Sequence, residues 1–405
     1  MHHPTPINYA GVDWATDAHQ VAVVDPAGAL VAEFSVPHTA DGLADLCRRL
    51  NKTTVARVAI ERPDGPVVDA LLDAGLDVVV VSSRSIKALR IRYGTAGNKS
   101  DRSDAYVLAD CLRTDGHRWP SLQRDTPATV TLRSHVRARK DLVETRVHVA
   151  NQLRAHLHVV FPGAVGLFRD IDSPISLRFL ERFPSATRAA WLSEKRLAAW
   201  LRANGYSGRK TPAELYARLT RAAPGIGGDD GDARGAVAVA FVTVLKNLRT
   251  QIDELETRIT ELLDAHPDAV IFQSLPRSGT IRAATLLAEI GDCRARFPDP
   301  ESLACLAGVA PSTRASGRHR AVTFRWAADN KLRDAVCDFA GDSWRANTWA
   351  EQRYRQLRAS GKRHPHAVRI LARSWLTIIW RCWQDRTPYD PAQHGNHQRL
   401  IREAA

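Results

Sequence analysis

The sequence lacks several features that define whole classes of protein. Its 405 residues include only six cysteines, all isolated and none in a Cys-x-x-Cys pair, so neither a disulfide framework nor a cysteine zinc site is indicated. No apolar run approaches the ~18 residues that a membrane helix needs, and the first ten residues have no apolar signal core. Hydrophobic residues make up 44% and charged residues 25%, which excludes a collagen-like or wholly disordered chain. We therefore expect a cytoplasmic protein of two or three domains with no membrane contact.

Basic charge is abundant and unevenly distributed. Lysine and arginine number 57 against 44 acidic residues, for a formal net charge of +13. Residues 1–125 hold 14 basic and 16 acidic side chains, residues 126–275 hold 21 and 16, and residues 276–386 hold 20 and 10. Because neutralised phosphates release counterions, a basic second half favours a nucleic-acid partner. Solubility, or a genome that favours arginine, would explain the charge equally simply.

The first 115 residues predict an α/β layer with a mixed sheet. Alternating and β-branched runs indicate five strands, over 7–12, 20–25, 30–36, 55–60 and 77–81. Helical patterns cover 41–50, 66–74 and 101–113, the last with Ser100 as its N-cap. Three strands followed by alternating helices and strands are the element order of an RNase H-like fold.

The rest of the chain predicts helices. A long helix over 126–160 is followed by short helices and then by a second long helix over 233–266. Within the second, apolar residues recur at heptad spacing, which predicts a coiled coil formed within the chain or with a second protomer: Leu245, Leu248, Ile252, Leu255, Ile259 and Leu262. Further helices are expected at 282–290, 326–344 and 365–383, with a Pro/Ser/Gly/Arg-rich loop at 311–320 and five core tryptophans between 344 and 383.

These patterns divide the chain into three domains and a tail. We expect the mixed-sheet domain over 1–125 and a helical coiled-coil domain over 126–270, with an insertion at 161–232. A mainly helical domain would cover 271–390, and 391–405 would be a tail. The fold class is therefore α/β plus α.

Four carboxylates fall where such a sheet would bring them together. Asp13 and Glu61 end the first and fourth strands, which are neighbours in an RNase H-like sheet, and Asp101 and Asp104 share one face of the helix beside them. Clustered acids raise one another's pKa, and a pair of Mg²⁺ ions would remove that repulsion and clamp a phosphodiester. Each acid also has an ordinary explanation: a strand-end turn, pairing with Arg57 or Arg62, or the positive end of a helix.

Three segments resemble the RuvC-like DEDD domain of the insertion sequence 110 family of transposases: Gly11-Val-Asp13-Trp14-Ala15, Ala59-Ile-Glu61 and Asn98-Lys-Ser-Asp101-Arg-Ser-Asp104-Ala105. Two more are similar to the Gly-Leu-x-Pro … Ser-Gly core of its transposase domain: Leu303-Ala-Cys-Leu-Ala-Gly308-Val-Ala-Pro311 and Ala315-Ser316-Gly317. The chain departs from the family pattern at two places. Pro276-Arg277-Ser278-Gly279 replaces Pro-Gly-Ile-Gly, and Asp329 stands where a glycine is usual.

The resemblance implies a recombinase that moves an insertion sequence in DNA. Its tetrad would be Asp13, Glu61, Asp101 and Asp104, binding Mg²⁺, and its nucleophile would be Ser316, which forms a covalent phosphoserine link to DNA. The family also implies guidance by a noncoding bridge RNA. It further implies a homodimer or tetramer whose active sites combine the tetrad of one protomer with the serine of another.

The residues around Ser316 can be read without the family. Arg314, Arg318 and Arg320 would hold a scissile phosphate, although on the local residues alone a basic surface turn is the better interpretation, which the family resemblance reverses. Ser312 and Ser278 are fallback nucleophiles, and His319 is the one nearby base. On the first long helix, a further basic set would follow nucleic-acid backbone: Arg133, Arg137, Arg139, Lys140 and Arg146.

Two other functions remain open from the sequence. A RuvC-type structure-specific nuclease would hydrolyse DNA at the same four acids and would not need Ser316. A non-catalytic nucleic-acid-binding regulator would use the basic second half alone, and its carboxylates would be structural.

Overall fold

The computed structural model describes residues 7–93, 100–317 and 319–395. The chain divides into two compact units, residues 1–124 and 125–405, and each is described by itself. The division into three domains that the sequence suggests stays a prediction.

The first unit is built on a mixed five-stranded sheet of order β3-β2-β1-β4-β5. β1 pairs antiparallel with β2 and parallel with β4, which pairs parallel with β5. The predicted mixed sheet is confirmed, with β1 and β4 adjacent as an RNase H-like order requires. The strands are β1 (Asn8–Asp13), β2 (Ala18–Val24), β3 (Leu30–Pro37), β4 (Val55–Ile60) and β5 (Asp77–Val80).

Helices cover both faces of this sheet. Strand residues alternate between the two faces, so Ala10, Val12 and Ile60 pack with apolar residues of α1 and α2, whereas Tyr9 and Ala59 pack with residues of α4. The helices are α1 (Ala40–Lys52), α2 (Pro66–Asp73), α3 (Ser83–Arg90) and α4 (Asp101–Asp115). α3 was not predicted, because it is short and polar and has little apolar periodicity.

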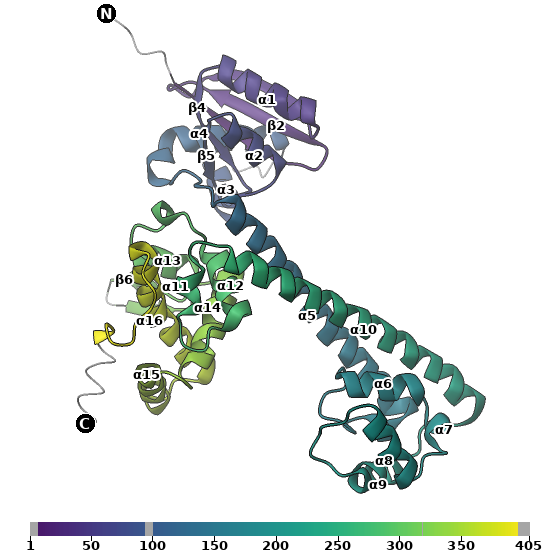
Figure 1. Cartoon of the computed structure of the whole chain (residues 1–405). Coiled ribbons are helices and arrows are strands. Elements are labelled where there is room, and N and C mark those ends of the chain that lie inside the picture. The colour runs from purple at the N-terminus through teal and green to yellow at the C-terminus, as the bar shows by residue number, and fades with distance from the viewer. Residues whose placement is uncertain (1–6, 94–99, 318, 396–405) are drawn as a thin grey trace, which may run out of the picture. The chain divides into compact units, whose positions relative to one another are not determined.

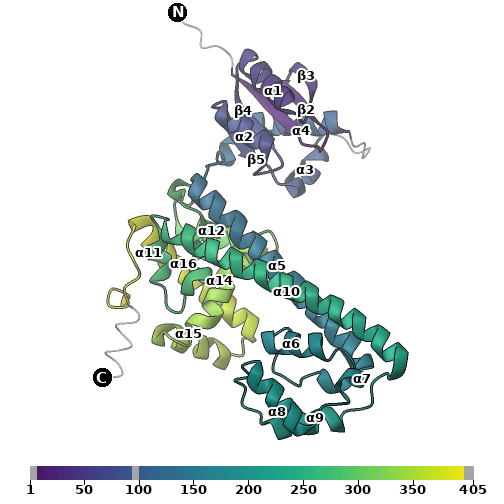
Figure 2. The ribbon, with the colours of Figure 1, turned by 45° about the vertical axis from the view of Figure 1, so that its right-hand side comes forward.

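The second unit contains two long helices that lie side by side, α5 (Pro127–Val160) and α10 (Gly228–Asp264), as Figure 1 and Figure 2 both show. On α10, Leu245, Ile252 and Ile259 are buried at intervals of seven residues, while the predicted seam residues between them are only half-buried. The two helices pair within the chain, and a coiled coil with a second protomer stays a prediction. α10 begins five residues earlier than predicted, with Asp229 and Asp230 favourably placed in its first turn.

The segment predicted as an insertion forms four short helices that share a hydrophobic core with the two long helices. Phe179, Phe183 and Leu197 are buried there together with Leu153 and Leu245 from the two long helices. The helices are α6 (Pro174–Arg182), α7 (Ala186–Ala189), α8 (Glu194–Ala203) and α9 (Pro212–Arg221).

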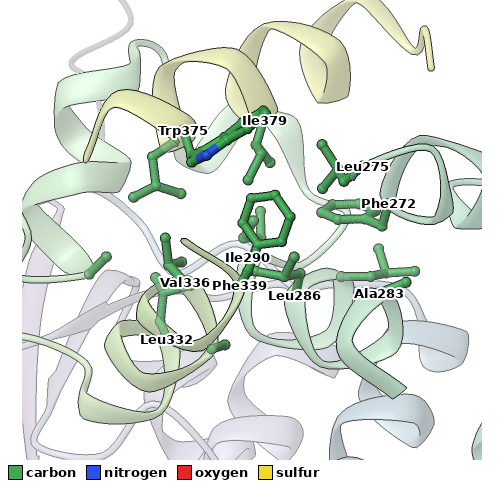
Figure 3. Packing of buried hydrophobic residues seen from close by; sticks show 14 of the residues in the cluster. Phe272, Leu275, Ala283, Leu286, Ile290, Leu332, Val336, Phe339, Trp375 and Ile379 are labelled. Atoms are coloured by element: carbon green, nitrogen blue, oxygen red, sulfur yellow. The ribbon is translucent and has the colours of Figure 1, made fainter. Parts of the chain in front are cut away.

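A separate hydrophobic core joins the remaining helices of this unit. Figure 3 shows Phe272, Leu286, Phe339 and Trp375 converging from four helices. The expectation that the tryptophans of the C-terminal region belong to the core is confirmed, since all five from 344 to 383 pack in this cluster. The helices are α11 (Ala269–Gln273), α12 (Gly279–Ile290), α13 (Pro300–Leu306), α14 (Asn330–Ser343), α15 (Thr348–Ala359) and α16 (His364–Asp385).

Two elements of this region differ from expectation. The segment predicted as a loop is a hairpin of β6 (Ser312–Ser316) and β7 (His319–Thr323). α14 begins at Asn330 rather than at Trp326, because the Asp329 side chain caps it by accepting hydrogen bonds from the backbone of Lys331 and Leu332. None of the helices in the described residues could span a membrane.

Candidate functional site

Asp13 and Glu61 lie at the same edge of the sheet in the first unit. β1 and β4 are parallel, and Val12 is the register partner of Ile60. The residue after Val12 is Asp13, which ends β1, and the residue after Ile60 is Glu61, which directly follows β4. Because the two strands are parallel, both carboxylates lie at the same edge of the sheet. The two-residue period places Asp13 on the face of Gly11, and Glu61 on the face of Ala59, which is the face that α4 covers.

α4 is held against this face by a glycine. A Cβ atom at Gly11 would come within 2.5 Å of the backbone nitrogen of Ala109 and 2.6 Å of the Cβ of Leu108, and closer still to the carbonyl oxygen of Ala105. Only a residue without a side chain permits that approach. Since Ala105 lies over Gly11, the preceding residue, Asp104, is carried to the end of β1 where Asp13 stands.

The first turn of α4 supplies the other two acids. Ser100 caps the helix by accepting a hydrogen bond from the backbone of Ser103. Asp101 and Asp104 follow at a spacing that gives them one helical face. Asp104 is buried and Asp101 is exposed.

The other three acids all act electrostatically on Asp13. Burial, together with the negative charges of Asp104, Asp101 and Glu61, raises the pKa of Asp13 to about 6, against a smaller opposing effect of Arg90. A carboxyl group that senses three others in this way lies at the centre of a mutually repelling cluster. The structure thus brings together the four acids that the sequence singled out, and their catalytic and metal-binding roles stay a prediction.

Arg90, from the helix that the sequence did not predict, completes the cluster. Its Nε donates a 2.5 Å hydrogen bond to one oxygen of Asp104, and a terminal nitrogen donates to the other. The Asp104 side chain is only 3% exposed, so this two-point ion pair lies in a desolvated position. Arg90 therefore neutralises one of the four carboxylates.

The alternative role of Glu61, as an ion-pair partner of Arg57 or Arg62, is not supported by the partners of these two arginines. Arg57 pairs with Asp77 at 2.7 Å, and Arg62 pairs with Asp64 while its guanidinium stacks over Trp14, 4.3 Å from the ring centroid. Both arginines that could have paired with Glu61 thus have other partners.

The donor set suits a divalent cation. Carboxylate oxygens are the ligands that Mg²⁺ prefers, and the raised pKa of Asp13 reports a repulsion that a cation would relieve. In the parts of the chain that the structure describes, no three His, Cys, Asp or Glu side chains lie close enough together to hold a metal ion. The residues fit Mg²⁺ in the kind of ligand they offer, and the Arg90 guanidinium competes directly for Asp104.

Ser316 lies in the second unit, at the turn of the β6–β7 hairpin. It is the register partner of His319, and Gly317 between them takes a φ of 54° that favours glycine. Ser316 is exposed, and so is Arg314, two residues earlier and thus on the same side of the strand. Arg318 lies outside the described residues, and Arg320 is described only as part of the backbone of β7. Of the fallback nucleophiles, Ser312 is half-buried and Ser278 is buried.

The predicted basic face of α5 is occupied by ion pairs. Arg133 pairs with Asp125 and also donates to the carbonyl of Ala288. The other four have acidic partners as well: Arg137 with Glu289, Arg139 with Glu256, Lys140 with Asp334, and Arg146 with Asp172. Each of these side chains therefore has a structural partner inside the second unit, and contact with nucleic acid stays a prediction for all five.

Sequence reasoning missed two residues that shape the carboxylate site. Gly11 lay inside a quoted motif, and a glycine within a strand of apolar residues is itself a signal of close backbone approach. Arg90 left no such signal, because its pairing with Asp104 depends on how α3 and α4 pack.

Comparison with known proteins gives the same assignment along most of the chain. A family model of DEDD transposases of the IS110 group, described as "Transposase", matches residues 10–162. A second, described as "Transposase IS116/IS110/IS902 family", matches residues 269–355. The residues of the carboxylate cluster fall within the first match, and Ser316 falls within the second.

Relatives align over nearly the full length. The protein assigned as the transposase of the IS117 mini-circle in Streptomyces coelicolor is 32% identical over 94% of this chain and 95% of its own. The 43.6 kDa protein of insertion element IS110 from the same organism is 27% identical over 94% of this chain and 95% of its own. A solved structure, "T. thermophilus RuvC in complex with Holliday junction substrate", aligns with 29% of this chain and 99% of its own, at 15% identity and a TM-score of 0.24.

Proposed function

Because the chain belongs to the IS110 family of transposases, which cut and rejoin DNA, we propose a specific chemistry for it. Ser316 attacks a DNA phosphodiester and forms a covalent phosphoserine link. Mg²⁺ held by Asp13, Glu61, Asp101 and Asp104 assists, and a noncoding RNA selects the DNA.

The convergence of four carboxylates on one face of the sheet carries this proposal. Asp13 and Glu61 stand at the ends of adjacent parallel strands, and Asp101 and Asp104 occupy one helical turn beside them. Three of the four raise the pKa of the remaining one. A chain that needed these acids only for stability would gain by separating them, since clustered like charges are costly.

Rigid elements position the acids for this role. Strands and a capped helix hold side chains more narrowly than loops do, and the Gly11 contact fixes α4 on the sheet. With a pKa of about 6, Asp13 is mostly ionised at neutral pH and can act as a ligand. Mg²⁺ bound by these residues would polarise the phosphodiester and stabilise the charge that develops on its oxygens.

The exposure of Ser316 at a hairpin turn supports its proposed attack on a large polyanion. As its Oγ forms a bond to phosphorus, the bond from phosphorus to a deoxyribose oxygen breaks, and that oxygen takes up the proton that the serine hydroxyl gives away. The reverse step, by the hydroxyl of an exchanged strand, restores the serine without ATP. Arg314, on the same side of β6, would bind the phosphate oxygens. We propose that an oligomeric complex with DNA brings the serine and the four acids to one phosphodiester.

RNA guidance is the part of the proposal that rests on the family resemblance and on the basic charge of the second half. In such a system base pairing reads the DNA, and the protein binds the nucleic acids through backbone and shape. We therefore expect strand cleavage to require RNA transcribed from the noncoding flank of the element.

A covalent-trap assay tests the proposal. The protein is incubated with Mg²⁺, end-labelled DNA carrying the element junction and the flanking RNA, and the products are separated on a denaturing gel. We expect a protein–DNA adduct that is lost in Ser316→Ala and in Asp101→Ala. Ser312→Ala, four residues away on the same strand, is the matched control and should keep the adduct.

Other outcomes separate the alternatives. Cleaved DNA without an adduct, unchanged in Ser316→Ala, would contradict the serine step and favour a RuvC-type nuclease. DNA binding without cleavage under any condition, unaffected by Asp101→Ala, would favour a non-catalytic regulator. An adduct that forms equally well without RNA would contradict the guidance and leave the chemistry intact.

A further inference from the structure

Trp326 is the most exposed large hydrophobic side chain in the described part of the chain, at 79% of its accessible surface. It follows β7 by three residues, so it stands near the open end of the hairpin that carries Ser316 at its turn. The tryptophans of the C-terminal core, by contrast, are packed against apolar neighbours. Full exposure of an indole costs free energy, since burying it would remove a large apolar area from water.

The ring is exposed and yet held on a fixed support. Its neighbour Phe324 lies edge-on to it, with ring centroids 4.8 Å apart and planes at 81°. The guanidinium groups of Arg333 and Arg369 lie over Phe324 at 4.7 and 4.8 Å from its centroid. Arg333 in turn donates a 2.8 Å hydrogen bond to the carbonyl of Arg325, which ties the segment to α14. The indole is therefore held in place by Phe324 and the arginines around it, while its ring stays exposed to solvent.

The charge around Trp326 indicates what could cover that ring. Residues 311–333 hold six basic side chains and a single acidic one, Asp329, which is engaged in capping α14. A wholly apolar partner would leave this positive charge without counter-charge. Nucleic acid offers both complements at once, because every unpaired base presents a flat face for stacking and carries a phosphate.

We propose that Trp326 is a stacking platform for an unpaired base of the DNA strand that Ser316 attacks. This inference rests on the function proposed above. The hairpin separates its turn from its open end by about four residues, or roughly 13 Å. Trp326 follows that open end by three residues, so the stacked base lies several nucleotides from the scissile phosphate. Trp326 thus fixes the register of the strand on the hairpin.

Fluorescence of 2-aminopurine tests the assignment. Junction oligonucleotides carry this base at successive positions, two to six nucleotides from the cleavage point and unpaired in the substrate. With the full-length protein we expect quenching that peaks at one of these positions and is lost in Trp326→Ala. Affinity for the single strand should fall by roughly five- to a hundredfold, while the salt dependence should not change because no charge is removed. Trp326→Phe should restore most of both.

A matched control is available at Trp191, which is 50% exposed and stacks with Arg196 at 4.7 Å in the helical insertion. Trp191→Ala should leave the quenching pattern and affinity as in the parent protein. Thermal melting of each variant checks folding, and an exposed indole at position 326 should be removable without loss of stability.

Three results would overturn the assignment. One is unchanged quenching and affinity in Trp326→Ala. Another is quenching only when the 2-aminopurine lies in the RNA. The third is a smaller assembly of Trp326→Ala in analytical ultracentrifugation with unaltered DNA binding, since the indole would then contact a second protein chain. The proposed serine chemistry is judged separately by the adduct that Ser316→Ala loses, because the fluorescence and affinity measurements on Trp326→Ala need no strand cleavage.

Discussion

Both oxygens of the Asp104 carboxylate accept hydrogen bonds from the guanidinium of Arg90. The pair joins α3 to the first turn of α4, and Asp104 is nearly inaccessible to solvent. Of the four clustered acids, the most buried one is thus neutralised by a cation that the protein itself supplies. A metal ion that uses Asp104 must displace or share this arginine.

Replacement of Arg90 by glutamine should therefore tighten divalent-metal binding. Removing the competing cation leaves four carboxylates with less compensation, and we expect the Mg²⁺ or Mn²⁺ affinity to rise by about tenfold, since hydrogen bonds to charged groups contribute ~1.5–3 kcal/mol. Isothermal titration calorimetry on the full chain measures this directly. Arg92→Gln is the matched control, because Arg92 pairs with Asp115, which is not one of the four acids. Weaker metal binding in Arg90→Gln would show instead that Arg90 holds Asp104 in its liganding position.

The raised pKa of Asp13 predicts that the metal-free first unit loses stability as the pH rises. In the unfolded chain this carboxyl titrates near 3.9, whereas in the fold its pKa is about 6. Between these values the native state binds a proton that the unfolded state does not, so the free energy of unfolding falls across this window. Because Asp13 is partly exposed, we expect the free energy of unfolding to fall by up to about 2 kcal/mol, and the decrease should be complete above pH 7.

Asp13→Asn should abolish most of this decline. Urea titrations of the full chain at pH 5 and pH 8 in EDTA, read by hydrogen exchange of peptides from β1 and α4, compare the two proteins. Mg²⁺ should then stabilise the parent protein at pH 8 and have little effect on the variant. Equal pH dependence in both proteins would mean that the cluster does not control the titration.

Gly11→Ala should disrupt the site by separating α4 from the sheet. The added Cβ would overlap backbone atoms of Ala105 and Ala109, which cannot move without shifting the helix. We expect a loss of more than ~3 kcal/mol in the first unit, measured by the same urea titrations. Gly341→Ala, within α14, offers a contrast. The added Cβ would lie at an ordinary contact distance of 3.7 Å from Val368 of α16. This substitution should therefore stabilise the protein by about 0.5–1 kcal/mol.

The sequence predicted the parts of this fold that depend on local pattern. β-branched runs located all five strands, and the strand ends then placed Asp13 and Glu61, because adjacent parallel strands end at one edge. The hairpin around Ser316 was missed because its strands are polar and arginine-rich and have no apolar alternation. The ion-pair partners of arginines that lie far from them in the sequence could not be predicted either. Arg90 could be assigned to Asp104, and the arginines of α5 to their acids, only once helices distant in the sequence had packed together.

Two arginines with opposite environments separate structural from nucleic-acid-binding roles. Arg133 contacts the buried carboxylate of Asp125, which also accepts hydrogen bonds from the backbone of Asp292 and Cys293 and so anchors the start of α5 to the residues after α12. Arg314 is exposed on β6 beside Ser316. The first lies within a network that holds the second unit together, and we expect the second to bind a phosphate.

Arg133→Gln should therefore lower stability, and Arg314→Gln should lower DNA affinity. Loss of a partner for the buried Asp125 should cost about 2–4 kcal/mol, seen as an earlier urea transition in α5 and α12, with the salt dependence of DNA binding unaltered. Arg314→Gln should leave that transition in place and reduce the slope of log affinity against log salt concentration by about one, as expected for one lost phosphate contact. A reduced salt slope in Arg133→Gln at full stability would reverse the assignment, because it would require Arg133 to leave Asp125 and bind phosphate when DNA is present.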